Sequence, residues 1–150
     1  MMRLKIDVRA DSTLKHLREM EARSKNFRAV FMWAKRYLER ANSANFTSSG
    51  LPVGGWSPLD ARYAAWKSVN FPGRPIMQRS GKLFNSLRNL DNPAMRINNT
   101  SAEFGTIVEY AKFHQYGTNR MDKRKIVYEP VRFTQEFGEK AMKHIIEGRF

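Results

Sequence analysis

An apolar stripe in the first third of the chain constrains the fold more than any other feature of the sequence. From residue 14 to residue 41 an apolar or small residue recurs every three or four positions, and Lys and Arg fill the opposite face. This spacing is typical of an amphipathic helix. The positions of the stripe are Leu14, Leu17, Met20, Ser24, Phe27, Phe31, Ala34, Leu38 and Ala41.

The stripe predicts one continuous helix over residues 12–41, with Asp11 or Ser12 as its N-cap. A helix of about 30 residues is about 45 Å long at about 1.5 Å per residue. That length exceeds what a small domain needs to cover its own core. We therefore expect part of the stripe to contact a neighbouring subunit.

The rest of the chain predicts short helices and short strands. Alternation in "RLKIDV" predicts a half-buried strand, and "NFTSSGLPVGGWSPL" predicts an extended loop at about residues 43–57. The further expected elements are a helix over residues 58–69 capped by Ser57, a helix in "RSGKLFNSLRNL" capped by Ser80, a hairpin in "AMRINNTSAEFGTIVEY", a helix in "YAKFHQYG", a strand in "KIVYEP" and a helix over residues 131–148. This order predicts an α+β fold, in which a small, mainly antiparallel sheet is packed by the long N-terminal helix, two short middle helices and a C-terminal helix.

Length and composition narrow the class of protein. The 150 residues suit a single domain, residues 1–150. The absence of cysteine excludes disulfides and thiolate metal sites. We see no signal peptide and no apolar run long enough for a membrane span, so we expect a soluble protein that is cytosolic where it is made and has no membrane partner.

The net charge of +13 is unevenly distributed. Residues 61–90 contain six Lys or Arg and no Asp or Glu. Such an imbalance predicts a polyanionic or acidic partner. The alternative is a solvated basic face that only keeps the protein soluble.

The sequence offers little that resembles an active site. His114 lies in "YAKFHQYGT", but a catalytic role needs a nucleophile and an orienting carboxylate nearby. There is no HExxH, CxxC or paired-histidine spacing, and "GLPVGG" lacks the lysine of a phosphate-binding loop. We therefore expect no enzyme activity, no cofactor and no metal, and interpret His114 as a structural residue; catalysis and a specific interface contact are the alternatives.

Two other function classes have little support in the sequence. A toxin-type ribonuclease would need Arg79, Lys82, Arg88, Tyr110 and His114 to converge, and nothing in their spacing favours it. A sequence-specific DNA-binding module would need a helix-turn-helix with a polar recognition face. The chain shows only amphipathic stripes, so we expect at most backbone-level attraction to nucleic acid.

Three segments in order carry a resemblance to a known family. They are "WSPLDARYAAWK" (Trp56–Lys67), "IMQRSGKLFNSL" (Ile76–Leu87) and "FGTIVEYAKFHQYGT" (Phe104–Thr118). Together they resemble the Mu-type phage virion morphogenesis, or tail-completion, family. The family usually continues with a Pro-Ala-Arg-like segment, whereas this chain has "MDKRKIVYEPVRF", with Arg124 as the nearest counterpart of that arginine.

The resemblance implies a structural virion protein at the head–tail junction of a tailed phage. Such a protein completes the tail for head attachment as a subunit of a ring, often a hexamer, and catalyses no reaction. The implied partners are further copies of the chain, the neighbouring head-side connector and tail-terminator or tail-tube proteins, and phage DNA passing without sequence preference. A tail terminator and a head-side adaptor are the alternatives.

A ring subunit needs two unlike surfaces that meet head to tail. The candidate interface residues are Phe27, Phe31, Phe46, Leu51, Val53 and Trp56, where the loop residues form an arm that docks on a neighbour; the alternative is that Trp56 folds back onto its own core. The candidate residues facing DNA in a channel are Arg62, Lys67, Arg74, Arg79, Lys82 and Arg88. These basic residues would equally suit an acidic neighbouring ring.

The remaining motif residues are expected to be structural: Ser80, Gly81, Leu83, Tyr110, His114, Gln115 and Gly117. We expect the Tyr-Ala-x-x-His-Gln-x-Gly helix to fix the following turn through hydrogen bonds from side chains to backbone. Gly117 is expected to adopt the left-handed cap conformation. Gly117→Val should therefore destabilise the protein, because a β-branched residue disfavours positive φ.

Overall fold

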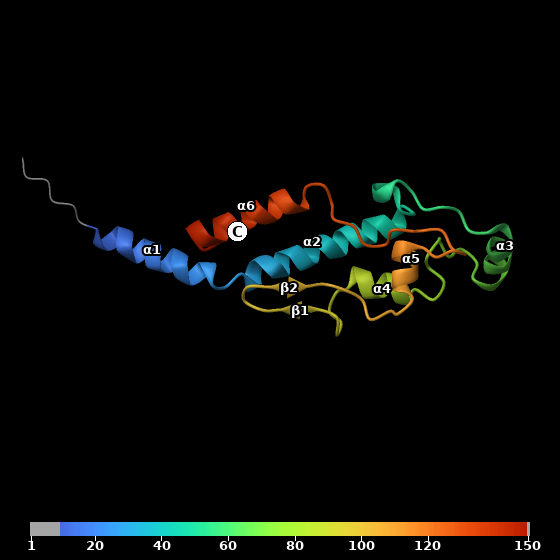
Figure 1. Ribbon diagram of the computed structural model, residues 1–150, viewed down its shortest axis with the longest axis horizontal. Coiled ribbons are helices and arrows are strands. Elements are labelled where there is room, and N and C mark those ends of the chain that lie inside the picture. The colour runs from blue at the N-terminus through green and yellow to red at the C-terminus, as the bar shows by residue number, and fades with distance from the viewer. Residues whose placement is uncertain (1–9, 150) are drawn as a thin grey trace, which may run out of the picture.

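The computed structural model describes residues 10–149 and has an α+β fold, as predicted. Within that range six α-helices accompany one antiparallel two-stranded sheet, in which Arg96 pairs with Glu103 (Figure 1). The elements are α1 (Asp11–Ser24), α2 (Arg28–Thr47), the 3-10 helix η1 (Leu51–Val53), α3 (Ala61–Asn70), α4 (Lys82–Arg88), β1 (Arg96–Ile97), β2 (Ala102–Glu103), α5 (Ala111–Tyr116) and α6 (Phe133–Glu147).

The prediction of a single helix over residues 12–41 is wrong, because the helix is interrupted between α1 and α2. At the break, the Phe27 N–H donates to the Asn99 carbonyl at 2.6 Å, and the Asn26 carbonyl lies 2.8 Å from His144 Nε2. The turn of the hairpin and helix α6 thus engage backbone groups at the interruption. The strand expected in "RLKIDV" lies outside the described residues.

Helix α6 packs along α2 through aromatic side chains. Phe31 stacks on Phe137 with ring centroids 6.1 Å apart, and Trp33 lies parallel to Phe133 at 6.4 Å. Helix α1, like α6, has no buried residue, and it extends away from the body (Figure 1). Its last turn meets α6, where Arg23 donates to the carbonyls of Ile145 and Ile146.

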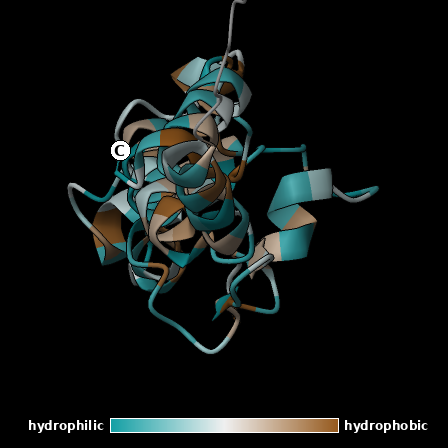
Figure 2. Ribbon diagram, turned by 90° about the vertical axis from the view of Figure 1, so that its left-hand side faces the viewer, coloured by the Kyte–Doolittle hydropathy of each residue, from teal (hydrophilic) through white to brown (hydrophobic). Residues whose placement is uncertain are grey.

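The main core lies where α4 and the following segments pack against the second half of α2. It contains Phe46, Trp56, Leu83, Leu87, Val108, Ala111 and Ile126. The ribbon viewed from the α1 end carries its hydrophobic segments mainly on the helices, whereas the connecting loops are largely hydrophilic (Figure 2). This core fixes the start of α4 and the position of α5, which the candidate site needs.

Several element boundaries differ from the predictions. Helix α2 continues to Thr47, so the connection to α3 is shorter than the expected loop and contains η1. The hairpin strands have two residues each, and "KIVYEP" does not form a strand. In that segment the backbone pairs instead with one side chain, that of Gln115.

Candidate functional site

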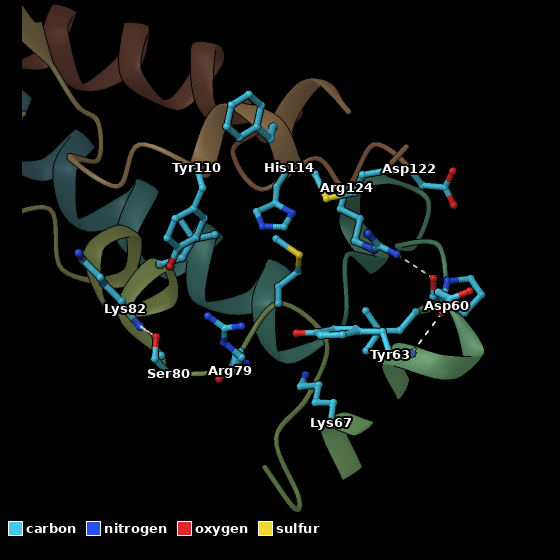
Figure 3. Close-up of a pocket in the computed structure, with 18 of the residues that line it drawn as sticks. Asp60, Tyr63, Lys67, Arg79, Ser80, Lys82, Tyr110, His114, Asp122 and Arg124 are labelled. Atoms are coloured by element: carbon cyan, nitrogen blue, oxygen red, sulfur yellow. Dashed lines mark hydrogen bonds between the residues drawn. The ribbon is translucent and has the colours of Figure 1, made fainter. Parts of the chain in front are cut away.

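A cavity of about 700 Å³, which we refer to as the motif pocket, is drawn in close-up in Figure 3. It adjoins α3, which lies at the end of the molecule opposite α1 (Figure 1). Four segments line it: the start of α3, residues 77–83 before and within α4, helix α5, and residues 120–124. The first three belong to the three sequence motifs quoted above. The fold therefore brings together segments that lie far apart in the chain. The lining residues are Pro58, Leu59, Asp60, Tyr63, Lys67, Met77, Gln78, Arg79, Ser80, Gly81, Lys82, Leu83, Tyr110, Phe113, His114, Arg120, Met121, Asp122 and Arg124.

Helix α3 contributes one wall of the motif pocket. Its N-cap is Asp60, whose Oδ1 accepts the N–H groups of Arg62 at 3.0 Å and Tyr63 at 3.2 Å. The predicted cap Ser57 is wrong by three residues, because the aspartate reaches both free amides of the first turn. Tyr63 and Lys67 are four residues apart, so they share the helix face that borders the cavity.

Lys67 is buried, with 5% of its surface exposed, and its Nζ donates to the Pro75 carbonyl. Burial lowers the pKa of this ammonium. Its charge thus ties the segment after α3 to the helix. Of the candidate DNA-facing residues, Lys67 is the one the fold places inside the protein rather than on its surface.

The segment before α4 turns sharply into the helix. Gly81 is the N-cap of α4 with φ 78°, and the Ser80 hydroxyl accepts the Lys82 N–H at 3.4 Å. Ser80 thus bonds the first turn, although the cap position itself is Gly81. Leu83 is buried and anchors this turn in the core, while Arg79 remains exposed at the cavity.

Helix α5 supplies the aromatic wall. Tyr110 and His114 meet edge to face with ring centroids 5.9 Å apart, and both border the motif pocket (Figure 3). Burial, and secondarily the Arg124 charge, lower the pKa of His114. Its buried Nδ1 has no hydrogen-bond partner among residues 10–149. No carboxylate orients this imidazole there, so the geometry does not form a nucleophile–base arrangement.

Arg124 connects three of the lining segments. Its side chain is buried and donates to the Ser57 carbonyl at 2.9 Å and the Pro58 carbonyl at 2.7 Å. Its backbone N–H donates to the His114 carbonyl at 2.8 Å. Arg124 therefore holds α5 against the start of α3, so this guanidinium is already engaged by the protein itself.

Gln115 performs the side-chain-to-backbone bonding expected of this helix. Its Oε1 accepts the N–H groups of Ile126 and Val127, and its Nε2 donates to the Val127 carbonyl, each at 2.9 Å. The His114 side chain makes no such bond through Nδ1. The turn after α5 is thus fixed by the glutamine rather than by the histidine.

Gly117 ends α5 with φ 76° and ψ 179°. Positive φ agrees with the prediction, but the left-handed cap conformation does not, because ψ is extended. The extended ψ leads into the turn in which Thr118 and Met121 pair. That turn carries Arg120 and Met121 to the cavity.

The charges around the motif pocket are unbalanced. Five basic residues line it (Lys67, Arg79, Lys82, Arg120 and Arg124), against two acidic residues (Asp60 and Asp122). The Asp60 carboxylate is occupied as a helix cap, and the Asp122 carboxylate points away from the cavity (Figure 3). Within the described part of the chain, neither Arg79 nor Arg120 forms an ion pair. The pocket therefore has a positive field.

The other candidate DNA-facing residues are dispersed. Lys82 lies at the pocket rim, while Arg62 and Arg74 are exposed on α3 and the loop after it. Arg88 lies over the Phe84 ring at 5.4 Å, at the end of α4. The fold brings Lys67, Arg79 and Lys82 to one cavity and leaves Arg62, Arg74 and Arg88 outside it.

The candidate interface residues are mostly used within the protomer. Phe46 and Trp56 are core residues, with rings 5.1 Å apart and edge to face, and Trp56 Nε1 donates to the Lys125 carbonyl at 3.0 Å. Val53 packs against the same core, whereas Leu51 is 74% exposed. The loop is therefore not a free arm.

Two features explain why these aromatic residues turn inward. Gly50 has φ 84°, and any Cβ there would overlap the Trp56 ring, so this glycine lets the indole lie on the backbone. Phe27 and Phe31 contact α6, at His144 and Phe137 respectively. The second half of the stripe thus packs onto the same chain.

The sequence reasoning missed several pocket residues. Asp60, Arg120 and Met121 were not singled out, although Asp60 in "PLDAR" is a standard N-cap type before a helix. Arg120 and Met121 lie in a segment where the resemblance ends. No local signal marks them, because their place depends on the turn after Gly117.

The comparison with known protein families gives a match over residues 8–147 to the phage virion morphogenesis family. The chain belongs to this family. No curated protein and no solved structure matches the chain. A phage virion morphogenesis protein is a structural or assembly component of the virion, and this one shares that role.

Two absences within residues 10–149 bear on the site. No group of three or more His, Cys, Asp or Glu residues there is arranged to hold a metal ion. None of the helices described combines the length and the apolar character needed to span a bilayer.

Proposed function

We propose that this virion morphogenesis protein is a ring-forming subunit of the head–tail junction that completes the tail for head attachment. Family membership supports a role in the virion. The observation that carries the finer proposal is a pair of unlike apolar surfaces, one on α1 and the other beside α5, which lie well apart along the molecule (Figure 1). Surfaces of this kind meet head to tail, and closure of the rotation gives a ring.

The first surface is the α1 stripe, formed by Leu14 and Leu17. These leucines are 48% and 54% exposed, on a helix that buries none of its residues. A 14-residue helix is marginal in water without tertiary packing. Docking on another subunit would bury the stripe and stabilise α1.

The second surface is a groove of about 740 Å³ beside α5, which we call the α5 groove. Its exposed apolar residues are Ile107, Tyr116 and Val127. The residues that form it are Thr106, Ile107, Val108, Glu109, Ala111, Lys112, Gln115, Tyr116, Ile126 and Val127. The α1 stripe of one copy fits a contact with the α5 groove of the next copy.

In this arrangement the neighbours of the ring are the head-side connector and the tail-terminator or tail-tube proteins, and phage DNA passes through its opening. The net charge of +13 lowers the electrostatic cost of a confined polyanion. DNA contacts of this kind involve the backbone and carry no sequence preference.

Particles made without the chain test the proposed place in the virion. We expect DNA-filled heads beside detached tails of normal length, counted by electron microscopy. Tails of irregular length would indicate a tail terminator instead, and intact virions would contradict the proposal.

A second test addresses the ring contact. Leu14→Glu with Leu17→Glu should remove ring density at the junction and reproduce the detached tails. The control is Lys15→Glu with His16→Glu, which changes exposed residues of the same helix outside the α1 stripe. Equal behaviour of the two double variants would exclude the α1 stripe as the ring contact.

A further inference from the structure

The motif pocket has the features of a docking site for an acidic peptide segment. Its aromatic rim is exposed: Tyr63, Tyr110 and Phe113 are 38%, 40% and 47% accessible. Tyr, Met and Arg are enriched where proteins bind one another, and Met77, Met121, Arg79 and Arg120 complete this cavity. Few proteins leave such residues together without a partner.

The size of the cavity favours a peptide over nucleic acid as its ligand. A volume of about 700 Å³ lies within the range of pockets that enclose a small ligand, which corresponds to a few side chains. A DNA duplex presents a convex backbone that contacts basic residues along an exposed surface. Arg79 instead lies beside Tyr63 at the cavity, with His114 across from it (Figure 3). An inserted apolar side chain flanked by carboxylates matches this lining.

The charge of the motif pocket favours a segment of a different protein over a second copy of the chain as its occupant. The pocket is basic and the chain as a whole carries +13, so the charge of the pocket favours a segment of an acidic protein over a segment of a second copy. Arg79 and Arg120 have no ion-pair partner in residues 10–149, while the Asp60 and Asp122 carboxylates are capped or turned away. Two free guanidiniums at one cavity suit bidentate binding of carboxylates.

We propose that the motif pocket binds an acidic segment with an apolar anchor, contributed by a different protein of the virion. This inference rests on the proposed function for the identity of the neighbour, but not for the chemistry of the pocket. Arg79 and Arg120 pair with the carboxylates, and the anchor side chain packs between Tyr63 and Tyr110. Lys67 and Arg124 hold the walls, because their hydrogen bonds are made within the chain.

Binding is measured by fluorescence anisotropy with purified protein and three probes. The first is a labelled ten-residue peptide of Asp and Glu around a central Leu-Trp pair. The second replaces each acidic residue by its amide, and the third is a twelve-base-pair DNA duplex. We expect the acidic peptide to bind at least ten-fold more tightly than the amide peptide. We also expect that adding the acidic peptide does not displace the bound duplex.

Matched variants locate the binding. Arg79→Glu with Arg120→Glu should weaken the acidic peptide at least ten-fold, whereas Arg18→Glu with Lys143→Glu makes the same charge change on α1 and α6 and should leave it within two-fold. Equal losses would show non-specific attraction and overturn the proposal. All four arginine and lysine side chains are exposed, so thermal unfolding should confirm that the variants remain folded.

The apolar anchor has its own matched pair. Tyr63→Ser at the motif pocket should weaken the peptide at least three-fold, and Tyr116→Ser in the α5 groove should not. No difference between these variants would overturn the anchor.

Photo-crosslinking in assembled particles identifies the natural occupant. With benzoylphenylalanine at position 110, we expect a crosslink to a peptide of another virion protein in which Asp and Glu outnumber Lys and Arg. A crosslink to DNA, to a further copy of the chain, or to nothing would overturn the proposal. Intact virions made without the chain would contradict the proposed function alone, whereas joined virions that carry the Arg79→Glu, Arg120→Glu variant would contradict this inference alone.

Discussion

Replacing Gly117 by alanine tests how the end of α5 shapes the motif pocket. A Cβ at this position would lie 3.0 Å from the Lys123 nitrogen, 3.2 Å from the Met121 carbonyl oxygen and 3.3 Å from the Lys123 Cα. All three atoms belong to the backbone, so no flexible side chain can move away. The alanine also inherits φ 76° with ψ 179°, a combination that only glycine adopts readily.

The expected loss follows from these two effects. The backbone conformation costs an alanine about 1–3 kcal/mol, and overpacking adds about 1–3 kcal/mol. The smaller entropy of the unfolded alanine variant offsets about 0.4–1 kcal/mol. The free energy of unfolding should therefore fall by about 1–5.5 kcal/mol, which lowers the Tm by about 2–20 °C for a chain of this size.

Two other glycines in the same chain separate the two effects. Gly73 has φ 70° but open space around its Cα, so Gly73→Ala should show conformational strain without overlap. Gly138 lies within α6, has open space and no positive φ, so Gly138→Ala should stabilise the protein by about 1 kcal/mol. Calorimetry and urea unfolding at one pH measure the series. If Gly117→Ala is no less stable than Gly73→Ala, the close approach of Lys123 and Met121 has no energetic effect and the reasoning fails.

Three further predictions concern neighbouring parts of the structure. Gln115→Ala should lower the free energy of unfolding by about 1–3 kcal/mol, because the buried Ile126 N–H loses its partner; an unchanged urea midpoint would contradict this. The folded state resists protonation of His114, whereas the unfolded state takes up that proton at a pKa of about 6.5. Stability should therefore decrease as the pH falls through about 6.5, and His114→Gln should flatten this decrease in Tm measured from pH 7.5 to 5; an equal pH dependence in both proteins would refute it. Trp56→Ala should lower the free energy of unfolding by about 3–5 kcal/mol and Leu51→Ala by less than about 0.5 kcal/mol, since Trp56 is in the core and Leu51 is exposed. Similar losses for the two variants in chemical denaturation would contradict the core position of Trp56 and support the docking-arm interpretation of the loop.

The helices could be predicted from the sequence because the apolar spacing that indicates a helix is local. The apolar stripe and the spacing in "RSGKLFNSLRNL" predicted amphipathic helices, and the structure has helices in both regions, although the single helix predicted from the stripe is divided into α1 and α2. The interruption between α1 and α2 could not be predicted from the sequence. It depends on Asn99 and His144, which lie far away in the chain and meet the backbone only after folding.

The candidate site could be predicted from the sequence only in part. Motif residues such as Tyr110 and Arg79 were singled out, but their convergence requires Arg124 to bind two carbonyls before α3. Lys67 was expected to face DNA or an acidic partner, and Trp56 either to dock on a neighbour or to fold back onto its own core, because burial cannot be read from residue type alone. Lys67 is buried because the Pro75 carbonyl accepts its ammonium, and Trp56 is buried because Gly50 leaves space for its ring.

The hydrogen bonds of Gln115 also affect how copies of the chain can associate. An extended segment with unpaired backbone groups is a template for β-pairing with another molecule. At residues 126 and 127 one amide side chain already occupies two N–H groups and one carbonyl. Strand addition at this segment is thereby blocked, so uncontrolled polymerisation through backbone edges is disfavoured here. In the proposed ring, contacts between copies at this segment would therefore be made by side chains.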